Sequence, residues 1–279
     1  MGGWNIMPTY ITVAEVRTAS GDFDEKVSDA RIEGIIDRIE KTSEKWLNTK
    51  FTPTAIIETQ TGNKTTFAIL EKNPVLAVRA LEINETSVTP AYIKAFKDSG
   101  KIVLTTEAEV SRFTSSAVGD VIISYLYGWV QESSTSTTID TASEAGSSVA
   151  LSVASESGFT ALDWVEIYGT DGNREVAQVS ATDTGELTVD QLVYDHVSGS
   201  TVVLLEIEAN VKRYLEVESA ITVVTAIIGA TATDITGHQL GDLRVQKGEP
   251  YAQWRATLIS LRAERDELKT RIKPKFSIM

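Results

Sequence analysis

The sequence Ile-Glu-Gly-Ile-Ile-Asp-Arg-Ile-Glu-Lys-Thr-Ser-Glu-Lys-Trp-Leu, residues 32–47, contains the pattern from which the fold is inferred. Its apolar residues recur at steps of three, four and seven, which is the spacing of one face of an α-helix. Asp22 and Glu25 are three residues apart, as in the pair that caps the start of a helix. The stretch therefore predicts an amphipathic helix near the N-terminus, with these two residues at its start.

After this helix the apolar period changes to two, which is the period of a β-strand. Residues 55–60 and 65–70 flank Thr-Gly-Asn-Lys at 61–64, a sequence that favours a turn. The two segments therefore predict a β-hairpin. Further strands are predicted at residues 74–83, 101–104 and 118–127.

Residues 131–207 differ from the rest of the chain in composition. They begin with a serine- and threonine-rich run, residues 132–138, which is typical of a linker. Short β-like segments follow at intervals of roughly ten residues, the spacing expected in a small β-barrel or sandwich. Arg174 is the only basic residue between Glu132 and Ile207. We therefore expect a separate module, inserted into the first domain.

The last part of the chain, residues 208–279, is predicted to be helical. One helix starts near Val211 and ends near Gly229, and a second begins at Pro250, because proline is favoured in the first turn of a helix. The second helix carries an apolar stripe with heptad spacing, which Arg265 interrupts. Such a stripe packs either on the first helix of the same chain or on another protein, and the sequence leaves both alternatives open.

Together these segments predict an α+β fold. Residues 1–130 and 208–279 are expected to form one discontinuous, mostly helical domain with a small β-sheet or hairpin. Residues 131–207 are expected to form the inserted all-β barrel or sandwich. The chain of 279 residues, with 42% hydrophobic and 23% charged residues, is long enough and apolar enough to bury a core in each.

The composition excludes several classes of site. The chain contains no cysteine, so disulfides, thiolate nucleophiles and cysteine-bound metals are excluded. No apolar run approaches the roughly 20 residues that span a bilayer, so no membrane association is expected. The net charge of −13 argues against a surface that grips nucleic acid, although an acidic wall would let DNA pass without adhering.

No pattern of residues indicates catalysis. His196 and His238 are the two histidines, and neither has a second histidine three or four residues away, as a zinc site of the usual spacing requires. Asp171-Gly172-Asn173 is more typical of a hairpin turn than of a calcium loop. We therefore predict that the protein is not an enzyme, with no catalytic, cofactor-binding or metal-ligating residues and no cofactor. A hydrolase that uses paired carboxylates stays an alternative, because sequence spacing does not show which carboxylates meet.

Three features of the sequence follow one another in a definite order along the chain. The long helix at 32–47 is followed by Phe51 and a strand pair, and a proline-led strand, Asn-Pro-Val-Leu-Ala-Val, occupies residues 73–78. A closing strand ends in a Tyr-x-x-Gly-aromatic sequence at 125–129, before the C-terminal helices. In this order the chain resembles the head–tail connector (adaptor) proteins of tailed viruses. The resemblance covers roughly the first 130 and the last 70 residues.

The resemblance implies a structural role in the neck of the virion, between capsid and tail. Connector proteins form a ring, usually of about twelve subunits, from copies joined head to tail. The ring binds the portal protein on one side and a stopper or tail-completion protein on the other. Genomic DNA passes through its channel without specific binding, and assembly takes place in the host cytoplasm.

The last helix is the expected site of contact with the portal protein. Apolar side chains buried between two proteins supply most of the binding energy of such interfaces. By the resemblance, the residues expected to contact the portal or another partner are Tyr251, Trp254, Leu258, Leu261, Arg265, Leu268, Ile272, Lys273 and Lys275.

The chain departs from the family in one large respect. Roughly 75 residues separate the closing strand from the next helix, whereas family members pass almost directly from one to the other. The insertion is therefore also a candidate binding module for capsid, tail fibre or glycan. If the insertion binds glycan, four of its aromatic residues are expected to line the sugar site. If it does not, they are expected to fill a small core. These residues are Phe159, Trp164, Tyr168 and Tyr194. A tail-terminator or stopper protein is a further alternative, but those proteins are usually all-β, and the helical patterns count against it.

Overall fold

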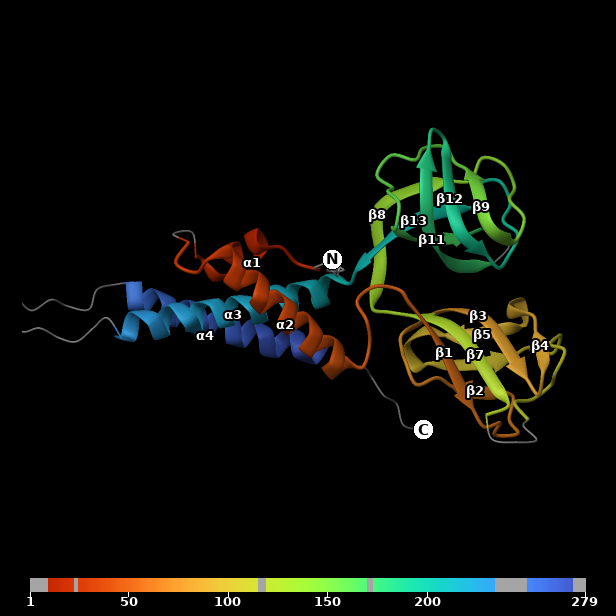
Figure 1. Cartoon of the computed structure of the whole chain (residues 1–279), viewed down its shortest axis with the longest axis horizontal. Helices are drawn as coiled ribbons and strands as arrows, with labels where there is room; N and C mark the ends of the chain where they lie inside the picture. The colour runs from red at the N-terminus through yellow and green to blue at the C-terminus, as the bar shows by residue number, and fades with distance from the viewer. Residues whose placement is uncertain (1–9, 23–24, 115–118, 170–172, 234–249, 273–279) are drawn as a thin grey trace, which may run out of the picture. The chain divides into compact units, whose positions relative to one another are not determined.

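The computed structural model describes residues 10–22, 25–114, 119–169, 173–233 and 250–272. The chain divides into two compact units. The helical unit combines the part up to Leu47 with the part that starts at Ala209, and the strand unit extends from Asn48 to Glu208 (Figure 1). Segments from the two ends of the sequence therefore fold together in one unit.

Four helices form the helical unit in the described residues. They are α1 (Val13–Ser20), α2 (Asp29–Leu47), α3 (Ala209–Thr233) and α4 (Pro250–Arg271), and α3 packs against each of the others. The amphipathic helix predicted at residues 32–47 is confirmed, because α2 buries Ile32, Ile35, Ile36 and Leu47. The helices predicted from Val211 and from Pro250 are confirmed as well.

The connection between α1 and α2 is built around Asp22, whose side chain is fully buried. Its carboxylate accepts hydrogen bonds from the backbone N–H of Lys26 at 2.9 Å and of Val27 at 3.2 Å. Because α2 begins at Asp29, the prediction that Asp22 and Glu25 cap this helix is wrong. A buried carboxylate needs hydrogen-bond donors, and the turn before the helix supplies them.

Glu40 is a second buried carboxylate, on α2. It accepts a hydrogen bond from the backbone N–H of Tyr10 at 2.7 Å, and the hydroxyl of Tyr10 donates to Glu44 at 2.9 Å. Burial raises the pKa of Glu40 to about 7 from its ordinary value of 4.5, although backbone hydrogen bonds from Tyr10 and Ile11 act in the opposite direction. Glu40 and Glu44 thus hold Tyr10, at the start of the described chain, against α2.

The raised pKa of Glu40 makes the stability of the helical unit depend on pH. A carboxyl group with a higher pKa in the folded state binds its proton more tightly there, so its contribution is complete below pH 4.5 and is lost as the pH rises through 7. We expect Glu40→Gln, which keeps an acceptor but does not ionise, to be about 1–2 kcal/mol more stable than the wild type at pH 8 and nearly equal to it at pH 5. Urea unfolding followed by far-UV circular dichroism measures both values. If Glu40→Gln and the wild type differed in stability by the same amount at pH 5 and at pH 8, the proposed role of Glu40 would be contradicted.

The strand unit contains three antiparallel sheets in the described residues. The strand orders are β1-β7-β3-β4, β2-β6-β5 and β8-β13-β10-β11-β12-β9 (Figure 1). The strands are β1 (Thr54–Gln60), β2 (Phe67–Ile69), β3 (Val75–Ile83), β4 (Thr86–Val88), β5 (Ile93–Phe96), β6 (Lys101–Leu104), β7 (Val121–Tyr127), β8 (Val130–Thr138), β9 (Gly146–Ser152), β10 (Trp164–Tyr168), β11 (Arg174–Asp183), β12 (Glu186–Leu192) and β13 (Thr201–Ile207). Two short 3-10 helices, η1 (Pro90–Tyr92) and η2 (Lys97–Ser99), flank β5.

The prediction of a mostly helical domain with a small sheet or hairpin is wrong. The described residues form four α-helices and 13 strands in three antiparallel sheets, with a strand content of 38%. The fold is α+β but rich in strands, because β1 to β7 bury a hydrophobic core of their own and do not merely decorate the helices. The predicted domain boundaries at residues 130 and 207 stay a prediction.

The hairpin predicted from residues 55–60 and 65–70 does not form. β1 pairs with β7, from Thr54 opposite Tyr127 to Gln60 opposite Val121, and β2 pairs with β6. Both strands lie close to the residues at which the alternation of apolar side chains predicted them, but each pairs with a strand that is distant in the sequence. Pairing depends on which apolar faces are buried together, and the period of a single strand does not contain that information.

The serine- and threonine-rich run at 132–138 is a strand, so its interpretation as a linker is wrong. It belongs to β8, which pairs with β13, and its residues are alternately more and less exposed. Threonine is β-branched and suits a pleated, half-exposed strand. At the end of β8, Ile139 forms a bridge with Val153, just after β9, so the two edge strands of the six-stranded sheet approach each other there around a buried core.

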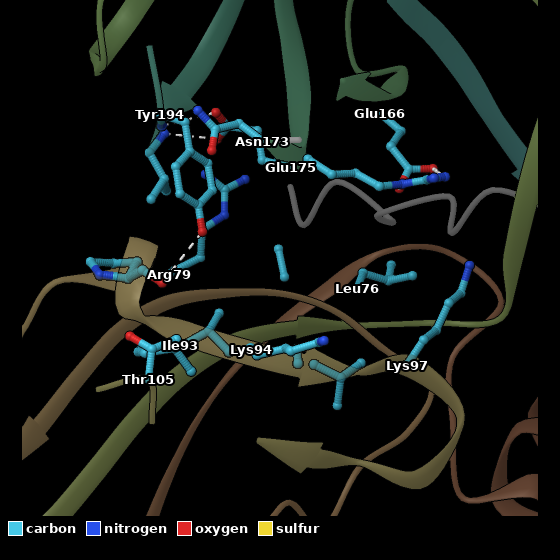
Figure 2. Close-up of a pocket in the computed structure, with 17 residues that line it drawn as sticks. Leu76, Arg79, Ile93, Lys94, Lys97, Thr105, Glu166, Asn173, Glu175 and Tyr194 are labelled. Atoms are coloured by element: carbon cyan, nitrogen blue, oxygen red, sulfur yellow. Dashed lines mark hydrogen bonds and ion pairs between the residues drawn. The ribbon is translucent and has the colours of Figure 1, made fainter. Parts of the chain in front are cut away.

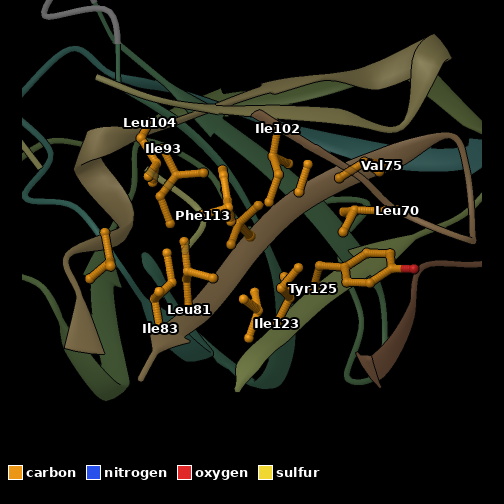
Figure 3. Close-up of a cluster of buried hydrophobic side chains, with 14 of the residues drawn as sticks. Leu70, Val75, Leu81, Ile83, Ile93, Ile102, Leu104, Phe113, Ile123 and Tyr125 are labelled. Atoms are coloured by element: carbon orange, nitrogen blue, oxygen red, sulfur yellow. The ribbon is translucent and has the colours of Figure 1, made fainter. Parts of the chain in front are cut away.

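The core of the β1–β7 region lies between the four-stranded and the three-stranded sheet (Figure 3). Tyr125 is fully buried in it, and its hydroxyl donates to Oε2 of Glu58 at 2.8 Å and accepts from the backbone N–H of Lys72 at 3.1 Å. At Gly128, a Cβ atom would lie 2.7 Å from the backbone oxygen of Thr52. The Tyr-x-x-Gly-aromatic sequence is therefore explained by a buried tyrosine and a close approach of two backbone segments.

Candidate functional site

The predicted partner contacts on α4 have different surroundings in a single copy. Leu261, Leu268 and Ile272 are buried within the helical unit. Trp254 and Leu258 are half-buried. Three of the predicted contacts therefore already take part in packing inside the unit, and contact of this helix with the portal protein stays a prediction.

The polar members of the predicted set are only partly described. Arg265 is half-buried, lies 2.8 Å from Asp266 and lies 3.9 Å from Glu218 on α3. Lys273, Lys275 and the side chain of Tyr251 lie outside the described residues. The interruption of the apolar stripe at Arg265 is thus explained by ion pairs near the α3–α4 contact.

A second candidate surface is one face of the four-stranded sheet, which we call the outer face. Cross-strand register places Ile57, Ser124 and Ala80 in one row, and Thr59, Ile122 and Glu82 in the next. Ile57 is 70% exposed and Ile122 is 39% exposed. Glu82 is the one charged residue of these two rows, so a single copy exposes a mainly uncharged patch with two large apolar side chains.

A pocket of about 400 Å³ lies within the strand unit (Figure 2). One side consists of β3, η1 and β5, and the other consists of β10, the start of β11 and residues 193–194. An apolar cluster that includes Leu126, Val130, Val176 and Leu205 joins the two sides. The volume is in the range of small-molecule sites.

Arg79 crosses from β3 to the six-stranded sheet. Its Nη2 donates to the backbone oxygen of Val176 at 2.6 Å, and its Nη1 lies 3.5 Å from the backbone oxygen of Gln191. The nearest carboxylate partner is Asp190, at 3.7 Å, and the Arg79 side chain is only 10% exposed. Burial lowers the pKa of Arg79, and the charges of Asp190 and Glu175 oppose this shift.

Glu175 is the more deeply buried of the two acidic groups that line the pocket, with 2% of its side chain exposed. It accepts hydrogen bonds from the backbone N–H of Val193 at 2.7 Å and of Tyr194 at 3.0 Å. His196 Nε2 lies 2.8 Å from the same carboxylate. Glu175 therefore organises the segment before β13, and its charge already has three partners.

Arg174 and Glu166 form an ion pair at the other end of the pocket, and Glu132 joins them at 2.6 Å. Hydrogen bonding to Glu166 raises the pKa of Arg174 above its usual value. The guanidinium of Arg174 also lies 5.0 Å from the ring centre of Tyr168, as in a cation–π contact. Its charge is thus balanced by two carboxylates.

The residues considered for metal binding and for sugar binding have separate surroundings. His196 is buried beside Glu175, and His238 lies outside the described residues. Asn173 lines the pocket, whereas Asp171 and Gly172 are not described. Within the described ranges, no three His, Asp or Glu side chains are grouped as metal ligands, and no helix is long and apolar enough to cross a membrane.

The four aromatic residues of the insertion do not share one surface. Phe159 is buried in the core of the six-stranded sheet, and Trp164 packs against the apolar cluster between the sheets. Tyr168 contacts Arg174, and Tyr194 lines the pocket with its hydroxyl 3.3 Å from the backbone oxygen of Pro90. A single stacking platform for a sugar is therefore not formed by these residues.

Sequence reasoning missed the pocket and the outer face. The pocket combines Arg79, Lys94 and Lys97 with residues 166–194, and no spacing in the chain links these segments. The one available signal was that Arg174 is the only basic residue of its region. The chain matches no protein-family model, and no curated protein sequence matches it.

Proposed function

We propose that this protein is a structural protein of a tailed virus, a head–tail connector subunit that forms a ring beneath the portal. The observation that carries the proposal is the order of the elements. Helix α2 is followed by the buried Phe51 and β1, then by β3 behind Pro74, then by β7 with Gly128 at its end, and finally by α3 and α4. This order is the one that the resemblance to connector proteins implies.

The ring joins the portal to a stopper or tail-completion protein, and DNA passes through it. Identical copies joined head to tail close into a ring when the rotation between neighbours divides a full turn. The outer face supports such a contact, since Ile57 and Ile122 are apolar side chains that a single copy leaves in water. We propose that a neighbouring subunit covers this face.

The distribution of charge favours assembly. Residues 131–208 contain fourteen of the 39 acidic residues and one of the 26 basic residues. The remaining chain therefore has as many basic as acidic residues, and the net charge of −13 arises from this one region. Subunits that contact each other through the remaining chain avoid most of the repulsion that a uniformly acidic protein would meet.

The mass of the purified protein in solution, alone and mixed with the portal protein of the same virus, tests the proposal. Light scattering behind a sizing column or native mass spectrometry measures it. We expect a closed oligomer, either alone or on the portal. A protein that is monomeric alone, and that stays monomeric and unbound when mixed with the portal protein, would contradict the connector function.

A substitution on the outer face tests the subunit contact separately. Ile57→Lys places a charge on a side chain that is 70% exposed, so the fold should tolerate it while ring formation is weakened at least about tenfold. Leu162→Lys is the matched control, because Leu162 is 74% exposed elsewhere in the strand unit. Equal assembly of both variants would show that another surface joins the subunits, without contradicting the ring itself.

A further inference from the structure

We propose that the pocket of the strand unit binds a small phosphate-bearing molecule, with Arg79, Lys94 and Lys97 as the residues that recognise the phosphate. This site goes beyond the connector function and does not depend on ring assembly. The three cationic side chains belong to β3, β5 and η2, and Glu166 and Glu175 face them from the other side (Figure 2).

The acidic groups of the pocket already have partners. Glu175 accepts two backbone hydrogen bonds and lies 2.8 Å from His196. Glu166 is paired with Arg174, on the same side of the pocket. Glu166 therefore has a cation of its own, whereas Glu175 is held by hydrogen bonds and also interacts with Arg79 through its charge.

Two of the three cations, Lys94 and Lys97, have only weak partners among the described residues. Lys97 Nζ lies 3.5 Å from the backbone oxygen of Val130, and Lys94 Nζ lies 5.4 Å from the ring centre of Phe96. Arg79 has its nearest carboxylate at 3.7 Å, and its two hydrogen bonds to backbone oxygens use only part of its five N–H donors. Four cationic side chains and two carboxylates line the pocket, and Lys94 and Lys97 are the two cations for which no carboxylate partner is found among the described residues.

A phosphate monoester suits this arrangement better than a single carboxylate. It carries up to two negative charges and three free oxygens, so it can interact with more than one cation at a time. The charge of the buried Arg79 is screened less than a charge in water, and the two exposed lysines add to the attraction at the mouth of the pocket. The volume of about 400 Å³ leaves room for an organic group attached to the phosphate.

Titration calorimetry on the full chain, in a phosphate-free buffer of low ionic strength, tests the proposal. The probes are inorganic phosphate, glycerol 3-phosphate and succinate. We expect saturable binding of glycerol 3-phosphate that is at least as tight as that of phosphate and tighter than that of succinate. Saturable binding should weaken as salt is added, because charge dominates recognition.

Two double variants separate the pocket from the general surface charge. Lys94→Gln with Lys97→Gln removes two exposed pocket cations and should weaken binding of glycerol 3-phosphate about tenfold or more. Lys64→Gln with Lys101→Gln makes the same change in net charge outside the pocket and should leave binding unchanged.

Three outcomes would overturn the proposal. The first is no saturable binding of either phosphate probe at about 10 mM, a concentration at which even millimolar affinity is visible. The second is equal weakening by the two double variants, which would assign the binding to general surface charge. The third is tighter binding of succinate than of both phosphate probes, which would exclude phosphate as the recognised group.

Discussion

Replacing Glu175 with alanine is expected to destabilise the strand unit by about 4 kcal/mol, the largest effect of any single substitution considered for this protein. The carboxylate is 2% exposed and serves three partners, the backbone N–H groups of Val193 and Tyr194 and the ring of His196. Alanine removes the acceptor and leaves the buried His196 and the two half-buried backbone N–H groups without it. Each buried donor that loses its acceptor costs about 1–3 kcal/mol.

Chemical unfolding followed by tryptophan fluorescence measures this loss, because Trp164 lies on β10 of the same sheet. Glu186→Ala is the matched control, since Glu186 is an exposed glutamate on the neighbouring β12. We expect the control to change the free energy of unfolding by less than about 0.5 kcal/mol. A cost below about 1 kcal/mol for Glu175→Ala would mean that the segment around residue 194 is held by other contacts.

Leu261→Ala and Leu268→Ala are each expected to destabilise the helical unit by about 3 kcal/mol. Both side chains are buried, and α4 packs against α3. Each substitution removes apolar contacts and leaves a cavity, so its cost exceeds the loss of transfer free energy alone. Far-UV circular dichroism during urea unfolding reports mainly on the helices and measures the change.

Ile259→Ala on the same helix is the control, because Ile259 is 63% exposed. It should change the stability by less than about 0.5 kcal/mol. Equal effects of the three substitutions would contradict the packing of α4 described above. If the prediction holds, removal of α4 would damage the helical unit itself, so contact with the portal is better tested by Trp254→Ala and Leu258→Ala, at two half-buried positions.

Several elements could be predicted because their patterns are local. The period of residues 32–47 specifies a helix with one buried face, and the alternation in residues 74–83 specifies a strand, whatever they pack against. The proline at 250 likewise begins a helix. The absence of cysteine excludes thiolate chemistry by composition alone. The two helices and the strand depend on neighbours within a few residues, and the exclusion of thiolates depends on composition alone.

Only the tertiary structure decided which strands pair and which distant side chains meet. β1 and β2 are joined by a turn-like sequence, yet each pairs with a strand further along the chain, because burial of the common core determines the pairing. Arg79 meets the backbone of Val176, 97 residues away, and this contact helps to form the pocket. A periodic pattern shows which face of an element is apolar. It does not show what covers that face, since burial is a property of the whole fold and, for the outer face and α4, of any assembly that the chain enters.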